Sequence, residues 1–478
     1  MSDSGSLTDL ISSEIFNGRP PNLPRRYREQ AAVDLADIQG NVLRGYTHPV
    51  AAYIFLRIDD VPRAKALLKR LMPQITSGVP WGDTAPATAL QFALTYAGLE
   101  RVGVSPEILA TFPEEFRQGM AARAELLGDR GPSAPDKWES GLGTGEAHAL
   151  LTVWAIDEAH LERVREELRA VGAAAGATTV INETRAQALS GGRDQFGFFD
   201  GISQPSVEGT GMKGRPGDGQ PNGAGQWRDV ATGEFVHGYV DEDGDLPAAP
   251  AAPFDRNGTF MVYRKLATDV AAFRKFVQEA GKQYPGGPEM LAAKIVGRWR
   301  DGTPISVSPD KPDPEVVKDP ARINDFSYAS DPQGLRCPRG AHIRRMNPRD
   351  TEGFFGGRLS NRHRIIRRGR TYGPPLPEGA MEDDGQERGL AFVCFNASIW
   401  RQFETVQGLW IDDGDPFGQG ADKDFLVGCP GNGNQKMTIP GNPPFFAAPQ
   451  PRLVTMRGGE YLYQPSISAL EWLVSADR

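Results

Sequence analysis

One acidic residue lies among aromatic residues in a pattern that could transfer protons. Asp200 follows Phe198 and Phe199 and lies between Gly197 and Gly201. Nearby apolar rings would raise the pKa of its carboxyl group, whereas a nearby cation would lower it. A carboxyl group tuned in this way can act as an acid or a base. The alternative, which this segment alone favours, is a turn aspartate between two strands.

A single histidine, His342, lies in the arginine-rich segment Arg336–Arg349. Positive neighbours lower the pKa of an imidazole and keep it neutral, which is the state that binds a metal. A capping or hydrogen-bonding histidine is the alternative interpretation.

A dense basic run covers Arg362–Gly373. Most runs of like charge are solvated surfaces. Ile365 and Ile366 nevertheless predict a strand whose next residue, Arg367, points inward. A buried guanidinium needs an anion such as a carboxylate, a propionate or a bound peroxide.

Composition excludes several functional classes. The 478 residues carry 53 basic and 61 acidic side chains, a formal net charge of −8, so we expect no nucleic-acid partner. Three cysteines are too few for a disulfide framework or an iron–sulfur cluster. The sequence has no zinc signature, nucleophile elbow, phosphate-binding loop or convincing dinucleotide fingerprint. The acidic runs Asp241–Asp245 and Asp412–Asp415 lack the terminal glutamate of a calcium loop and predict solvated turns.

Neither an export signal nor an apolar stretch long enough to span a membrane is evident in the sequence. We therefore expect a cytoplasmic protein that does not associate with membranes.

Hydrophobic periodicity predicts strands at 51–58, 90–96, 147–156 and 178–183, with helices at 64–71 and 158–171. This β-α-β-β-α-β order is typical of a ferredoxin-like fold. Strands at 258–263 and 390–395 and helices at 267–280 and 399–409 indicate a second such half. The expected fold is α+β, with tandem ferredoxin-like halves, antiparallel sheets and peripheral helices.

Four segments follow from this pattern. Residues 1–45 form an N-terminal arm, and 46–212 form the first half, with the Asp200 motif at its end. Residues 213–255 are a loop-rich connection, and 256–478 form the second half.

Taken together, the motifs resemble those of the dye-decolorizing (DyP-type) haem peroxidase family, in particular its larger members. The Gly-x-x-Asp-Gly motif is Gly197–Gly201, the proximal-histidine segment is Cys337–Arg344 and the distal-arginine segment is Ile366–Gly373. Asp37–Leu43 resembles the N-terminal signature of the family. The resemblance runs from about residue 35 to the C-terminus.

The resemblance implies one haem b per chain, bound in the second half. It implies that His342 is the axial ligand of the iron, that Asp200 is the distal acid-base and that Arg367 is the distal guanidinium. Hydrogen peroxide would be the oxidant, and dyes, phenols and other aromatic compounds would be reductants, through a ferryl porphyrin-radical intermediate. Some members carry an asparagine where this chain has Gly369.

Three further residues are candidates for supporting roles. An acid that accepts the second N–H of the axial histidine would raise its basicity. We expect Glu404 to be this acid, with an exposed helix glutamate as the alternative. Tyr372 and Trp410 are candidates for passing oxidising equivalents to bulky reductants, although most Tyr and Trp residues serve packing.

Two other functions remain open at this point. The same fold could belong to a haem-binding or haem-handling protein with incidental peroxidase activity. A non-haem acid hydrolase could use Asp200 and Glu404. The sequence does not indicate the oligomeric state.

Overall fold

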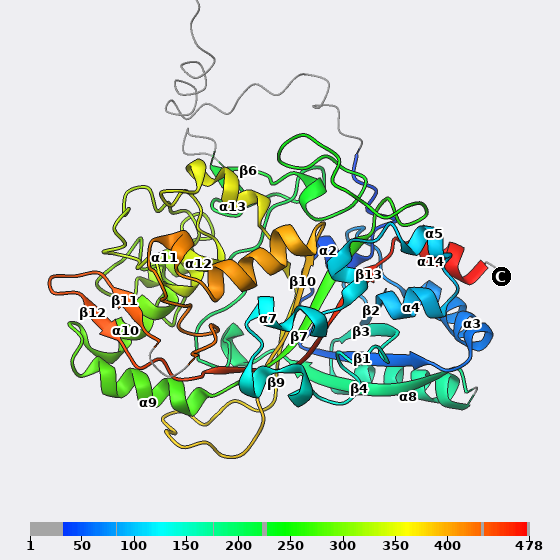
Figure 1. Cartoon of the computed structure of the whole chain (residues 1–478), viewed down its shortest axis with the longest axis horizontal. Helices are drawn as coiled ribbons and strands as arrows, with labels where there is room; N and C mark the ends of the chain where they lie inside the picture. Colours follow the sequence, from blue (N-terminus) through cyan, green and yellow to red (C-terminus); the bar gives the residue numbers. More distant parts are fainter. Residues whose placement is uncertain (1–31, 83, 175, 222–226, 432–434, 476–478) are drawn as a thin grey trace, which may run out of the picture.

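The computed structural model describes residues 32–82, 84–174, 176–221, 227–431 and 435–475. A nine-stranded sheet runs through the molecule in the order β4-β1-β3-β2-β13-β7-β10-β8, with β9 paired to β10 (Figure 1). The strands are β1 (Val50–Ile58), β2 (Thr88–Leu94), β3 (Ala149–Ala155), β4 (Thr178–Gln187), β7 (Thr259–Thr268), β8 (Ile366–Arg367), β9 (Arg370–Tyr372), β10 (Gly389–Asn396) and β13 (Val454–Gln464).

The first half has the predicted ferredoxin-like arrangement. Its strands lie in the order β4-β1-β3-β2, with helix α3 (Val61–Leu71) after β1 and α8 (Glu158–Ala174) after β3. Helix α3 begins where the Asp60 carboxylate accepts a hydrogen bond from the Arg63 amide, as an N-cap does. Its apolar residues, including Leu67 and Leu71, are buried against the sheet. The hydrophobic periodicity therefore predicted this half correctly.

The second half repeats the same strand order as β13-β7-β10-β8. Helix α9 (Val270–Gly281) follows β7, and the wide helix η9 (Ile399–Ile411) follows β10. Figure 1 shows α9 and α10 at the opposite end of the molecule from α3 and α8. The two halves form a single sheet because Tyr463 of β13 pairs with Leu94 of β2.

Strand β13 was absent from the sequence prediction. It contains Gly458 and Gly459, and its register with β7 shifts between Met456 and Gly458. A bulge and two glycines interrupt the alternation of side chains on which strand prediction depends.

The remaining elements are short and lie outside the sheet. The helices are α2 (Gly40–Leu43), α4 (Tyr96–Arg101), α5 (Pro106–Leu109), α6 (Glu114–Gln118), α7 (Ala124–Leu127), α10 (Gly287–Val296), α11 (Pro314–Lys318), α12 (His342–Met346), α13 (Arg358–Arg362) and α14 (Ile467–Ser475). Two hairpins are formed by β5 (Gln220–Pro221) with β6 (Trp227–Arg228), and by β11 (Met437–Ile439) with β12 (Phe445–Ala447). None of the helices in the described ranges is both long and apolar enough to cross a membrane.

The expected N-terminal arm falls in two parts. Residues 1–31 lie outside the described residues. The rest packs tightly, with Ile38 fully buried and α2 enclosed. The Gln39 side chain bonds both backbone groups of Phe92 and the carbonyl of Pro465. This segment therefore connects β2 to the residue that follows β13.

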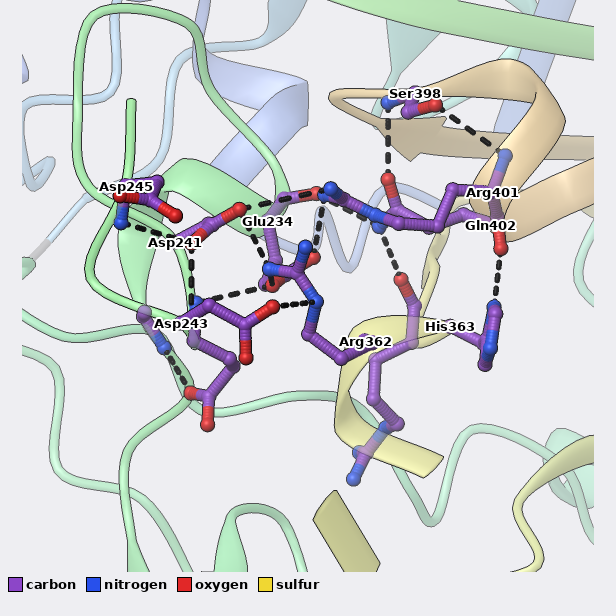
Figure 2. A network of polar contacts seen from close by, with 12 residues as sticks. Glu234, Asp241, Asp243, Asp245, Arg362, His363, Ser398, Arg401 and Gln402 are labelled. Atoms are coloured by element: carbon purple, nitrogen blue, oxygen red, sulfur yellow. Dashed lines mark hydrogen bonds and ion pairs between the residues drawn. The ribbon is translucent and has the colours of Figure 1, made fainter. Parts of the chain in front are cut away.

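A buried ion-pair network attaches the connection between the halves to the second half (Figure 2). Glu234 is fully buried and accepts hydrogen bonds from Arg362 at 2.6 Å and Arg401 at 2.8 Å. Arg362 also contacts Asp241 at 2.5 Å and Asp243 at 3.2 Å. The prediction of a solvated turn is therefore wrong for Asp241, whose side chain is only 3% exposed. It is buried because two arginines face it.

We expect Arg362→Ala to lower the free energy of unfolding by about 3 kcal/mol, because it leaves buried carboxylates of this network with fewer partners. Arg358→Ala is the matched control on the same helix. Arg358 is exposed, and its nearest carboxylate is 3.9 Å away, so its loss should cost less than about 1 kcal/mol. Urea unfolding of both variants measures the difference, and equal losses would contradict a structural role for the network.

Candidate functional site

His342 is the first residue of α12 and is held by a buried acid. Its Nδ1 lies 2.9 Å from Oδ2 of Asp424. The other oxygen of Asp424 accepts the amides of Leu426 at 2.9 Å and Val427 at 3.0 Å, which fixes the carboxylate. Because Nδ1 is engaged, Nε2 is the ring nitrogen left to bind a metal.

The electrostatics of this pair differ from the sequence expectation. Burial lowers the pKa of His342, but the charge and hydrogen bond of Asp424 outweigh it, so the pKa is raised. The expected net lowering of this pKa by neighbouring arginines is therefore wrong. Arg344 turns to the carbonyl of Cys337 at 2.7 Å, and Arg345 turns to that of Trp410 at 2.8 Å. Both guanidinium groups therefore donate hydrogen bonds to backbone carbonyls.

The prediction that Glu404 supports His342 is wrong. Glu404 is buried on another face of η9, where Arg123 donates two hydrogen bonds to it at 2.9 and 2.8 Å. Tyr461 of β13 donates a third, also at 2.9 Å. Its oxygens are thus engaged by the sheet and by the segment before α7. Helical spacing alone did not reveal which face of η9 would carry the acid.

Asp200 lies on a tight turn rather than in an apolar pocket. Gly197 and Gly201 adopt φ of +92° and +77°, a backbone conformation that glycine tolerates best. Phe196 and Phe198 pack on Phe273, with ring centroids 5.0 and 6.2 Å away. The Asp200 side chain is 57% exposed. The expected desolvation of Asp200 by phenylalanines is therefore wrong, because the turn directs Phe196 and Phe198 into the core and leaves Phe199 37% exposed.

The less exposed acid of this loop is Asp194, which is partly buried and was missed in the sequence. Its Oδ1 accepts the Phe198 amide at 2.9 Å, and its own amide donates to the Phe198 carbonyl at 2.8 Å. Burial raises the pKa of Asp194 to about 7, with the charge of Asp200 acting in the same direction. Asp194 therefore closes the turn that presents Asp200. The sequence signal for this role was an acidic residue four positions before Phe198, at the start of the turn.

Arg367 lies in β8, which confirms the strand predicted from the isoleucine pair. Its Nη2 donates to the Ser203 carbonyl at 2.9 Å, and its amide donates to the Gln204 side chain at 3.0 Å. Its Nη1 lies 4.0 Å from Oδ1 of Asp200. The segment after Asp200 thus holds Arg367, so the two side chains form one positional unit.

The segments that carry His342, Asp200 and Arg367 lie close enough together for their charges to interact. The charges of Arg367 and Asp194 both act on the pKa of His342, and the charge of Asp200 acts on that of Asp194. The structure therefore brings together the predicted residues His342, Asp200 and Arg367.

Further arginines make this region strongly positive. Arg298, Arg349 and Arg364 are buried, and burial lowers the pKa of Arg298 to about 9 and that of Arg364 to about 10. Arg298 and Arg349 both donate to the side-chain oxygen of Asn324. Among the described residues, none of the three has a carboxylate within 4.0 Å. Such a cluster suits an anionic group.

Gly369 leaves no room for the asparagine of some relatives of the resembled family. A Cβ atom at this position would lie 2.6 Å from the carbonyl oxygen of Ala391 in β10. The close approach of the two backbones thus requires glycine.

The two candidate electron-transfer residues are both buried. Tyr372 is 5% exposed, and its hydroxyl donates to Oε1 of Glu387 at 3.0 Å. Trp410 is 4% exposed and packs edge-on against His363 and Phe354, with ring centroids 5.0 and 5.5 Å away.

The side chains at this site fit a metal ion whose ligands come mostly from a cofactor and not from the protein. In the part of the chain that the structure describes, no group of three or more His, Cys, Asp or Glu side chains could hold a metal ion. His342 offers one nitrogen, which is the contribution that a protein makes to the iron of a haem.

Comparisons with known proteins show which proteins the chain is similar to. Residues 37–188 match the model of the DyP dimeric alpha+beta barrel domain. The chain is 31% identical to a dye-decolorizing peroxidase of Mycena epipterygia over 96% of this chain and 91% of that protein. A solved dye-decolorizing peroxidase in complex with 2,6-dimethoxyphenol is 26% identical, with a TM-score of 0.79, and covers 93% of this chain and 100% of its own. Another, whose haem pocket was engineered for asymmetric sulfoxidation, is 25% identical, with a TM-score of 0.78, over the same shares.

We expect Asp194→Asn to stabilise the protein at high pH, because asparagine keeps the hydrogen bond to Phe198 without the buried charge. A carboxyl group whose pKa is raised from 3.8 to about 7 loses its contribution to stability as pH rises through that window. The variant and the wild type should therefore be equally stable near pH 4 and differ by about 4 kcal/mol near pH 8.

Unfolding free energies measured across this pH range test the prediction. Asp383→Asn, at an acid that is 68% exposed, is the control and should show no such divergence. A constant difference between the Asp194 variant and the wild type at all pH values would refute the assignment of a buried titrating group.

Proposed function

The chain belongs to the DyP-type (dye-decolorizing) peroxidase family, and on that premise we propose that it reduces hydrogen peroxide at a haem and oxidises dyes, phenols and other aromatic compounds. The observation that carries the proposal is the convergence of His342, fixed by Asp424, with the Asp200–Arg367 unit. An axial ligand with a distal acid and a distal cation is the set that peroxide cleavage requires.

The cofactor we propose is one haem b per chain. Nε2 of His342 would bind the iron, and the cluster of Arg298, Arg349 and Arg364 would hold the propionates. When bound, haem supplies the iron at which the O–O bond of peroxide is broken. Asp424 accepts the Nδ1 proton of His342 in a hydrogen bond and so raises the basicity of Nε2.

Asp200 and Arg367 would divide the distal chemistry between them. The Asp200 carboxylate would take a proton from one oxygen of peroxide and return it to the departing oxygen. Arg367 would stabilise the negative charge that develops on that oxygen, a role for which fixed donors are worth about 3 kcal/mol. Its hydrogen bonds to Ser203 and Gln204 hold it in place beforehand.

Tyr372 and Trp410 are our proposed routes for electrons from reductants too bulky to enter the haem pocket. Tyr372 follows Arg367 by five residues, and β8 and β9 both pair with β10. Trp410 lies in the last turn of η9 and packs beside His363.

The other functions considered have less support. Proteins that match almost the whole chain are named as peroxidases, so a haem-handling role is not favoured. An acid hydrolase using Asp200 and Glu404 is also not supported, since Arg123 and Tyr461 engage Glu404. A cytoplasmic location stays a prediction.

The purified protein should show the intense visible absorbance of haem, and His342→Ala should lose or shift it, because the variant lacks the axial nitrogen. Absorption spectra after saturation with haem measure the effect. His160→Ala, at a histidine paired with the exposed Asp157, is the control and should match the wild type. An unchanged spectrum in His342→Ala would contradict axial ligation by this residue.

Asp200→Asn should slow the reaction with hydrogen peroxide by about 100- to 10,000-fold, because it removes the proton carrier. Arg367→Leu should slow it by about 100-fold, because it removes the stabilising charge. Stopped-flow mixing of each haem-loaded variant with peroxide measures both effects. Asp301→Asn, at an acid whose Oδ1 accepts only a local amide, should react at the wild-type rate. Wild-type rates in both distal variants would overturn the assignment.

A further inference from the structure

The hydroxyl of Tyr372 donates a hydrogen bond to the carboxylate of Glu387, which is partly exposed to solvent. Tyr372 ends β9 and is almost completely buried, and its hydroxyl donates to Oε1 of Glu387 at 3.0 Å. The side chain of Glu387 is 41% exposed. A buried phenol is thus connected to solvent through one acceptor.

A buried phenol can lose an electron readily only if its proton leaves as well. Burial, together with the charge of Glu387, raises the pKa of Tyr372 well above its ordinary value, so the phenol is protonated before it reacts. Removing the electron alone would leave a positive charge in an apolar environment, which is costly.

The neighbouring cation strengthens this constraint. Nζ of Lys265 lies 5.0 Å from the centroid of the Tyr372 ring. A positive charge on the ring would be repelled by this ammonium group. The arrangement therefore disfavours a charged tyrosine radical and favours a neutral one, which requires a proton acceptor within hydrogen-bond distance.

We propose that Glu387 accepts the phenolic proton of Tyr372 each time Tyr372 passes an electron toward the haem. The O–H bond of Tyr372 breaks, a new O–H bond forms at Oε1 of Glu387, and one electron leaves the ring. A reductant then supplies one electron, and the proton returns to the phenolic oxygen. This inference rests on the proposed peroxidase function, which supplies the oxidising equivalent.

Ion pairs hold Glu387 in position for this exchange. Lys265 lies 3.6 Å from its Oε1, and Arg457 lies 3.3 Å from its Oε2. Lys265 also pairs with Glu139 at 2.6 Å. The carboxylate is therefore fixed at both oxygens while it remains partly in contact with solvent.

Tyr372 is also held by the loop that carries the distal acid. The side-chain amide of Gln195 donates to the carbonyl of Tyr372 at 2.8 Å. The charge of Asp200 reaches Arg370, which starts the same strand. Tyr372 therefore lies five residues after Arg367, on a strand that the loop of Asp200 holds in place.

The test compares haem-loaded wild type with Tyr372→Phe, Glu387→Gln and Glu387→Asp. Samples are frozen shortly after addition of hydrogen peroxide, and the tyrosyl radical is quantified by electron paramagnetic resonance. We expect a radical signal that disappears in Tyr372→Phe, falls at least five-fold in Glu387→Gln and is partly restored in Glu387→Asp. Turnover of a bulky anthraquinone dye should fall in parallel.

Glu382→Gln is the matched control, since Glu382 precedes Glu387 by five residues, is 83% exposed and, within the described residues, pairs with Lys275 alone. It should give the wild-type radical yield. The rate of the first reaction with hydrogen peroxide, measured by stopped flow without dye, and the visible spectrum before peroxide is added should be the same in all variants. A failure of the proposed function would therefore appear in these two measurements and in the wild type.

Two results would overturn the inference while leaving the peroxidase function intact. One is a radical yield in Glu387→Gln equal to that of the wild type. The other is a wild type that consumes peroxide without any signal dependent on Tyr372. If Glu387→Gln does not fold, the comparison of Glu387→Asp with the wild type decides the question.

Discussion

The hydrogen bond between His342 and Asp424 is the constraint on which the site depends. It joins residues 82 positions apart, and its geometry determines which ring nitrogen is free. The acid can serve this role only because two backbone amides, from Leu426 and Val427, occupy its other oxygen. Loss of either support would let the imidazole rotate, and the remaining residues would then face a metal site without a defined axis.

The opposite side of the site is built by backbone rather than by side-chain packing. Asp200 is placed by a turn that Asp194 closes, and Arg367 is placed by the segment that immediately follows Asp200. The two functional groups therefore move together. Both side chains are partly exposed, whereas Arg298, Arg349 and Arg364 are buried.

The sequence was most informative where function depends on local chemistry. His342, Asp200 and Arg367 could be singled out as candidates from their immediate neighbours, whereas their roles came from the resemblance to a family; the ferredoxin-like order followed from hydrophobic periodicity. Contacts across the fold could not be predicted in this way. Asp424 was missed because its partner is distant in the chain, and Glu404 was chosen wrongly because its helix presents it to Arg123. Strand β13 was missed because a bulge hides its pattern.

The junction between the two halves has a consequence for the stability of the protein. Within the described residues, one pair, Tyr463 with Leu94, is aligned across the junction between β13 and β2. The side chain of Gln39 bridges the same junction. Removal of either half would leave β13 or β2 as an unpaired edge strand, and such edges favour aggregation. The site itself takes Asp200 from the first half and His342 and Arg367 from the second. A group that binds only the folded site therefore stabilises both halves together.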